Sequence, residues 1–241
     1  ELIYALYAQD HSIYLDLLAN LKAYHQEILA GLFSEIDLQV HQELEDIFEQ
    51  IAQLFFEPLA ENHAFQYDQL VSFGELISSK ILAAYLTHKS YSCSWLDAKA
   101  LIRTDNHYQE AQVDWNKTID LCQQHVKEVF DRVDIAITQG FIGQTAEGFT
   151  TTLGREGSDY SAGILAYCCA AESVTIWKDV PGMLNADPKY FENTQLLSQI
   201  SFKEAIELSY YGASVIHPKT VQPLQQKNIS LYVRSFLDPA A

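Results

Sequence analysis

The chain has few basic side chains: its 241 residues include 15 Lys and Arg against 32 Asp and Glu, a formal charge of −17. A nucleic-acid backbone and an anionic membrane surface both attract clustered Lys and Arg, so this charge argues against either as a general partner. No apolar run reaches the roughly 18 to 20 residues needed to span a bilayer, and no signal-peptide pattern opens the chain. The sequence therefore favours a cytoplasmic protein with no nucleic-acid or membrane partner.

Cysteine is also scarce, and the residues that occur do not follow the spacing of metal ligands. They are Cys93, Cys122, Cys168 and Cys169, of which the last two are adjacent within a predicted helix. Reduced thiols are the simplest interpretation, and we predict no protein metal site.

Apolar residues make up 48% of the chain, which is enough for a substantial core in one large domain. They recur at helical spacing over 2–32 and 38–56, which predicts a helical hairpin, and a third helix is expected over 68–86. We find no internal repeat. Residues 1–241 are therefore expected to form a single domain whose first part, 1–90, is mainly helical.

The remainder, 91–241, alternates strands with helices. Strands are predicted at 91–96, 111–113, 134–138, 173–177 and 229–233. Helices are predicted at 115–130, 159–171, 202–211 and 219–226. Such alternation implies a largely parallel sheet with helices on both faces. We thus expect an α/β fold, a three-layer αβα sandwich with a mostly parallel central sheet, preceded by the helical part.

A glycine-punctuated turn precedes one of the predicted helices. Gly154 and Gly157 permit close approach of the backbone to a bound group, and Ser158 or Asp159 is a good N-cap. These features alone also fit an ordinary capped helix. Arg155 adds a guanidinium that can grip a carboxylate through two parallel hydrogen bonds. Together with Ser158 and Asp159, it predicts a site able to hold an amino acid at both ends.

A second turn, which begins with Lys178 and Asp179, follows the apolar strand at 173–177. The carboxyl ends of parallel strands are where open sheets bind ligands. A single Asp there also serves as turn punctuation, but Lys178 and Lys189 favour a site for a nucleotide phosphate and ribose. The two turns therefore predict two halves of one cleft for phosphoryl transfer to a small molecule.

Two further candidates have ordinary structural alternatives. Glu75 is either an acceptor for a substrate ammonium or a carboxylate that favours the first turn of its helix. His217 has the chemistry of a catalytic histidine, but Pro218 and the helix after it favour a helix-start role. The same ambiguity applies to Lys219.

Five ordered blocks between residues 69 and 234 carry a family resemblance. They are 72–75 (SFGE), 138–143 (TQGFIG), 151–159 (TTLGREGSD), 177–182 (WKDVPG) and 211–218 (YGASVIHP). In this order they closely resemble the motifs of aspartokinases, members of the amino-acid kinase family that phosphorylate the side-chain carboxylate of aspartate. The helical first third is similar to the family only in its general character.

The resemblance implies L-aspartate and MgATP as ligands. Aspartate would be held by Glu75, Phe141, Thr152, Arg155, Ser158 and Asp159. Among these, Arg155 would bind a carboxylate, Glu75 or Asp159 would lie near the ammonium, and Arg155 and Asp159 are the expected catalytic residues. The product would be 4-phospho-L-aspartate, at the first step of lysine, threonine and methionine biosynthesis.

The resemblance also places the nucleotide. ATP would lie along Lys178, Asp179 and Lys189, with Mg²⁺ bridging its phosphates. Leu184 and Ser214 occupy positions where many relatives carry a nucleotide-contacting Tyr and Lys, and Lys219 is a substitute for the missing cation.

Other departures concern the ends of the chain and one side chain. The family opens with a strand and a Lys-Phe-Gly-Gly-Thr-Ser motif, which nothing here matches, so we expect a missing preceding segment and impaired turnover. In this family, ACT regulatory domains usually follow the kinase part, and we expect none in the sequence that ends at Ala241. A homodimer is expected of the full-length protein. Glu156 adds a negative charge where the family usually has glycine, and we expect its side chain to point outward.

Two alternatives remain open. Another amino-acid kinase, acting on glutamate or acetylglutamate, is disfavoured by the context of Phe141, Thr152 and Arg155. A non-catalytic interaction or regulatory domain is favoured by the unmatched phosphate motif and by Glu156.

Overall fold

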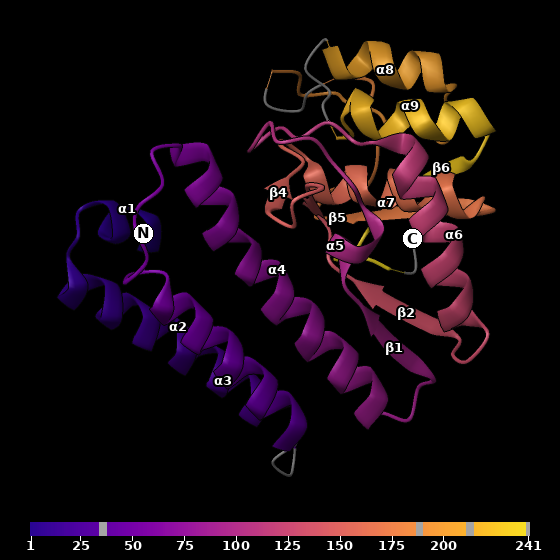
Figure 1. The fold of residues 1–241 in the computed structure, drawn as a ribbon. Helices are drawn as coiled ribbons and strands as arrows, with labels where there is room; N and C mark the ends of the chain where they lie inside the picture. The colour runs from indigo at the N-terminus through magenta and orange to yellow at the C-terminus, as the bar shows by residue number, and fades with distance from the viewer. Residues whose placement is uncertain (34–37, 187–189, 211–214, 240–241) are drawn as a thin grey trace.

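The computed structural model describes residues 1–33, 38–186, 190–210 and 215–239 (Figure 1). The helices are α1 (Leu2–Tyr7), α2 (His11–Leu32), α3 (Leu38–Gln53), α4 (His63–His88), α5 (Ala98–Leu101), α6 (Trp115–Phe130), α7 (Gly157–Cys169), α8 (Phe202–Tyr210) and α9 (Pro218–Lys227). The strands are β1 (Cys93–Leu96), β2 (Ile135–Thr138), β3 (Ile142–Gln144), β4 (Thr150–Thr152), β5 (Ser173–Lys178) and β6 (Ser230–Ser235).

The first part of the chain is helical, as predicted, and α2, α3 and α4 lie side by side (Figure 1). The expectation of one helix over 2–32 is wrong, because Gln9 adopts a left-handed φ of 54° and ends α1. Asp10 then caps α2 by accepting a hydrogen bond from the Ile13 amide at 3.0 Å. The Tyr14 hydroxyl donates to the Ile51 carbonyl at 2.7 Å and joins α2 to α3.

Helix α4 connects the helical part to the α/β part. It begins at His63 rather than at Asp68, because the Asn62 side chain caps it and accepts from the amides of Ala64 and Phe65. By length and composition α4 is apolar enough to cross a membrane. However, its buried residues include Leu70, Ile77 and the carboxylate of Asp68, and the helix contacts α3, β1 and β4. We therefore assign it as the core helix that links the two parts.

The α/β class is confirmed, with parallel pairing of β1 with β2 and of β5 with β6. In the described part of the chain these strands form separate pairs, and β3 with β4 is an antiparallel pair that was not predicted. The strand expected at 111–113 is wrong, since only Val113 forms a bridge, to Thr104. The β1–β2 pair lies between α4 and α6 (Figure 1).

A second core holds α7, α9 and the β5–β6 pair together. Its buried side chains include Ile176, Val221 and Leu224. Gly163 permits the close packing of α7 on α9, because a Cβ there would lie 2.9 Å from the Thr220 carbonyl. The result is that the start of α7 lies beside the carboxyl end of β5. The four cysteines are free thiols, as predicted.

Candidate functional site

The start of α7 presents the predicted turn. Gly154 and Glu156 both have a positive φ, of 80° and 54°, and the helix begins at Gly157. The prediction that Ser158 or Asp159 is the N-cap is therefore wrong: Glu156 holds that position, without a capping hydrogen bond from its side chain, and the other two lie in the first turn. The unpaired amides at the start of a helix favour an anion, and this holds for α7 whichever residue is its N-cap.

Lys178 joins the two predicted halves of the cleft. Its Nζ lies 2.7 Å from Oδ2 of Asp159 and 2.9 Å from Oε2 of Glu156. All three side chains are largely withdrawn from solvent, with exposed fractions of 21% for Lys178, 12% for Asp159 and 29% for Glu156. The expectation that Glu156 points outward is wrong, because the ammonium of Lys178 attracts its carboxylate inward. One cation and two carboxylates thus share this corner.

The pKa values of this trio follow from burial and charge. Burial raises the pKa of Asp159, and the negative Glu156 adds to this, while Lys178 acts in the opposite direction. Burial lowers the pKa of Lys178, but its contacts with Asp159 and Glu156 outweigh burial and leave it raised. Oδ2 of Asp159 is buried and accepts no well-directed hydrogen bond from any described residue, although Lys178 lies within ion-pair distance. The charge of this oxygen is therefore balanced by the ammonium of Lys178.

Phe141 is fixed against the same turn through its backbone. It adopts a φ of 70°, its amide donates to the Ser161 hydroxyl at 2.8 Å, and its carbonyl accepts from the Leu153 amide at 2.8 Å. The predicted substrate residues Phe141, Ser158 and Asp159 are therefore brought to one end of α7.

Gly140 sets the distance between this loop and α7. A Cβ at Gly140 would lie 2.8 Å from Cβ and 2.9 Å from Cα of Ser158. We expect Gly140→Ala to destabilise the protein by about 2 kcal/mol, because the backbone of α7 must shift, and to lower activity. Urea unfolding measures this change. Gly31→Ala is the control, since nothing lies within 4 Å of its added Cβ and a helix interior prefers Ala; an equal effect of the two substitutions would contradict the packing argument.

Thr152 contacts a carboxylate that the sequence analysis missed. Both Thr152 and Asp68 are fully buried. Asp68 accepts from the hydroxyl and the amide of Thr152, each at 2.8 Å, and from the Gln109 amide at 2.9 Å. The Thr152 hydroxyl is thus directed to α4 in this structure. No local pattern signals Asp68, because its partners are distant in sequence.

The remaining predicted substrate residues are Arg155 and Glu75. Arg155 is exposed, and no described residue pairs with its guanidinium. Glu75 lies half-buried on α4, and burial raises the pKa of its carboxyl. No described side chain forms a hydrogen bond or ion pair with the Glu75 carboxylate, so an ammonium ligand would satisfy it.

The predicted nucleotide residues are only partly brought together. Asp179 is exposed directly after Lys178, whereas Leu184 pairs with Leu196 in a separate bridge. Lys189 and Ser214 lie outside the described residues.

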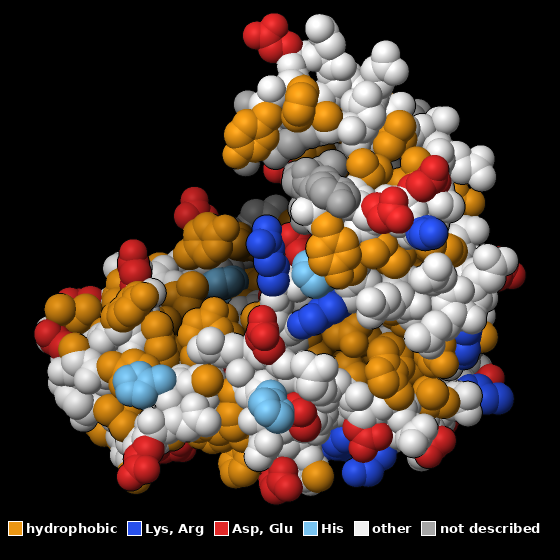
Figure 2. Space-filling model, turned by 90° about the horizontal axis from the view of Figure 1, so that it is seen from above, with side chains coloured by type: hydrophobic (Ala, Val, Ile, Leu, Met, Phe, Trp, Pro, Cys, Tyr) orange, Lys and Arg blue, Asp and Glu red, His pale blue; other side chains and the backbone are white. Residues whose placement is uncertain are grey.

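The start of α9 approaches the α7 turn. His217 caps α9, its Nδ1 accepting from the Lys219 amide at 3.2 Å, which confirms the helix-start prediction. Burial lowers the pKa of His217, as do the charges of Lys219 and Arg155. Figure 2 shows a hollow between the helical part and the rest of the molecule, with Lys and Arg side chains gathered around a His at its edge.

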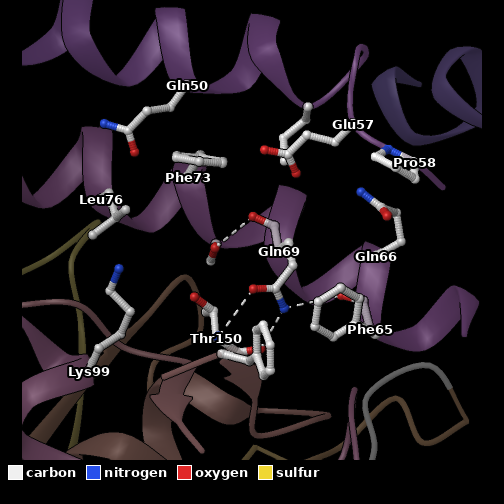
Figure 3. A pocket seen from close by; sticks show the side chains of 13 residues that line it. Gln50, Glu57, Pro58, Phe65, Gln66, Gln69, Phe73, Leu76, Lys99 and Thr150 are labelled. Carbon is white, nitrogen blue, oxygen red and sulfur yellow. Dashed lines mark hydrogen bonds between the residues drawn. The ribbon is translucent and has the colours of Figure 1, made fainter. Parts of the chain in front are cut away.

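A separate cavity of about 320 Å³ lies between the helical part and β4 (Figure 3). Glu57 and Gln50 point into it from one side and Lys99 from the other. Gln69 closes its floor, since its side chain accepts from the Thr150 amide at 3.2 Å and donates to the Thr150 carbonyl at 2.8 Å. None of the predicted site residues that the structure describes lines this cavity.

Comparisons with known proteins show which proteins the chain is similar to. A model of the amino acid kinase family matches residues 18–235. The chain is 35% identical over 204 residues to lysine-sensitive aspartokinase 3 of Escherichia coli, covering 84% of this chain and 45% of that protein. It is 32% identical over 220 residues to the aspartokinase of Chlamydia trachomatis, covering 91% and 48% respectively.

A solved structure is also similar. E. coli aspartokinase III in complex with aspartate and ADP superposes with a TM-score of 0.86 at 30% identity, covering 100% of this chain and 54% of that one. The chain thus spans about half the length of these relatives.

Proposed function

Because the chain belongs to the amino acid kinase family, we propose that it is the catalytic part of an aspartokinase. It would transfer the terminal phosphoryl group of ATP to the side-chain carboxylate of L-aspartate. The similarity to aspartokinases over most of the chain supports this substrate. The aspartate and ADP bound by the E. coli relative support the two ligands. For the longer protein we also propose a homodimer.

One observation carries the proposal: the 2.7 Å contact of Lys178 with Asp159. It joins the end of β5 to the first turn of α7, so a group at one turn is within reach of a group at the other. Phosphoryl transfer needs this proximity, because catalysis of that reaction is mainly positioning and neutralisation of charge.

The acceptor side of the site uses residues around the start of α7. The exposed guanidinium of Arg155 suits a carboxylate of aspartate through paired hydrogen bonds. The carboxylate of Glu75, which has no described partner, and the carboxylate of Asp159, which pairs with Lys178 through Oδ2, are the candidate partners of its ammonium. The reacting carboxylate is ionised at neutral pH, so no general base is required. These residues would orient it and exclude water.

The nucleotide side fits the chemistry of a phosphate chain. Lys178 lies at the end of β5 and Lys219 at the start of α9, and both offer cationic groups. The backbone amides at the start of α7 also favour an anion. Carboxylate oxygens of the kind Asp159 and Asp179 carry are suitable ligands for Mg²⁺. When bound, Mg²⁺ would neutralise phosphate charge.

A second candidate function is a non-catalytic domain. The observation that favours it is the Glu156 carboxylate at 2.9 Å from Lys178, since it occupies a cation that phosphates need. A coupled assay of ATP consumption by the full-length protein separates the candidates. We expect turnover with aspartate and little with glutamate. Preference for glutamate would overturn the substrate, and absence of turnover with either would favour the non-catalytic domain.

Arg155→Ala tests the acceptor side. We expect kcat/KM for aspartate to fall about tenfold, which corresponds to about 1.4 kcal/mol of transition-state stabilisation. The loss should appear mainly as a raised KM for aspartate, because Arg155 would contact the non-reacting carboxylate. Steady-state kinetics measures it. Arg132→Ala, an exposed arginine after α6, is the control; equal kinetics of the Arg155 variant and the wild type would remove Arg155 from the site.

A further inference from the structure

Lys178 is held between two carboxylates, and the sum of the three charges is −1. The two acceptors differ in how firmly they are placed. Asp159 belongs to the first turn of α7 and is 12% exposed, whereas Glu156 lies on the preceding turn and is 29% exposed. Lys178 is the only described ion-pair partner of Glu156. Of the two carboxylates, Glu156 is therefore the one that can move away.

Glu156 combines a left-handed backbone with a side chain that contacts Lys178. Its φ of 54° lies in the left-handed region, which favours glycine over residues with a Cβ. A glutamate at this position thus carries a conformational cost. Its carboxylate does not offset this cost by capping α7, since no capping hydrogen bond forms. It is turned to Lys178 instead, with Nζ to Oε2 at 2.9 Å.

A phosphate anion that approaches Lys178 meets this arrangement. With both carboxylates in place, the local charge is negative and repels the anion. Moving Glu156 toward solvent would leave Lys178 paired with Asp159 alone and neutral in sum, beside the amides that start α7. The Glu156 carboxylate and a nucleotide phosphate therefore compete for the same ammonium.

We propose that Glu156 is an internal competitor for phosphate at Lys178 and thereby determines the affinity of the site for nucleotide. The proposal rests on the proposed function, since it assigns the ligand of that site. Rotation of the Glu156 side chain alone is enough to leave Lys178 with a single carboxylate partner, because the described residues supply Glu156 with no other ion pair. The turn itself keeps its conformation.

The test is equilibrium binding of MgADP and of inorganic tripolyphosphate to the full-length protein by calorimetry. Glu156→Gln keeps the side-chain shape and removes the charge. We expect it to bind both probes roughly fivefold more tightly than the wild type, the upper end of the range for solvent-screened ion pairs. Glu156→Gly suits the left-handed backbone and should give the same gain if the Gln variant folds poorly. Glu128→Gln, an exposed glutamate on α6, is the control.

Lys178→Met identifies the cause of the gain. In the Lys178→Met protein, Glu156→Gln should leave the affinity for both probes unchanged within about twofold, because the ammonium for which Glu156 and phosphate compete is gone. Equal or weaker binding by both Glu156 variants would overturn the proposal, as would a gain that persists without Lys178. Failure of every protein, including the wild type, to bind MgADP would instead overturn the proposed function together with this inference.

Discussion

Asp159→Asn is expected to lower kcat/KM for phosphoryl transfer to aspartate about 100-fold in the full-length protein. Asp159 belongs to both halves of the site, since it lies in the first turn of α7 and pairs with Lys178 at the end of β5. Asn keeps the shape but cannot neutralise an ammonium, and loss of one preorganised electrostatic contact in an enclosed site costs on the order of 100-fold or more. Steady-state kinetics in aspartate and in MgATP measures the loss.

The control for this substitution is Asp131→Asn. Asp131 forms an exposed ion pair with Lys127 at 2.9 Å, a contact that contributes little to stability. We expect its kinetics to match those of the wild type. Unfolding curves of both variants separate a catalytic effect from a folding effect. Activity of the Asp159 variant within threefold of the wild type would show that this carboxylate does not contact the reacting groups.

The sequence predicted the positions of these side chains better than their contacts. The glycines and the polar residues of the α7 turn indicated where Arg155 and Asp159 would lie, and the end of β5 indicated Lys178. The ion pair of Glu156 with Lys178 was not predictable, because the direction of a side chain in a left-handed turn depends on the neighbour across the cleft.

Helix prediction was most accurate for three amphipathic helices. The helices over α3, α6 and α9 were expected close to their observed bounds. The strands β3 and β4 were missed because each has only three residues, too few for alternation to show. The first residues of α4 were missed for another reason: the helix was expected from residue 68, whereas the Asn62 side chain caps it so that it begins at His63.

Asp68 is the clearest case of a residue whose role depends on distant partners. It lies on α4, while the amide and hydroxyl it accepts from belong to Thr152, 84 residues later. Its carboxylate thereby ties the helical part to β4, directly before the turn that carries Arg155. The site therefore depends on a buried contact that no motif contains, and its removal is expected to have a large effect.

Asp68→Ala is expected to destabilise the protein by about 3 kcal/mol. The substitution leaves the buried amide and hydroxyl of Thr152 without their acceptor, and each unsatisfied buried group costs about 1 to 3 kcal/mol. Asp68→Asn should cost less than about 1 kcal/mol, because its amide oxygen still accepts from the backbone and its NH₂ can donate to the Thr152 hydroxyl. Urea unfolding measures both, with the exposed Asp46→Asn on α3 as the control.

The pH dependence of the stability distinguishes the effect of the Asp68 charge from the effect of its hydrogen bonds. Burial raises the pKa of Asp68 above its ordinary value of 3.8, although hydrogen bonds from Gln109 and Thr152 oppose the shift. A raised carboxyl pKa means that its stabilising contribution is fully present below 3.8 and is lost as pH rises through the raised value. Since Asn does not ionise, the Asp68→Asn variant should gain stability relative to the wild type between acidic and neutral pH. If the unfolding midpoints of the wild type and of the Asp68→Asn variant changed in parallel across this pH window, burial would not penalise the ionised carboxylate.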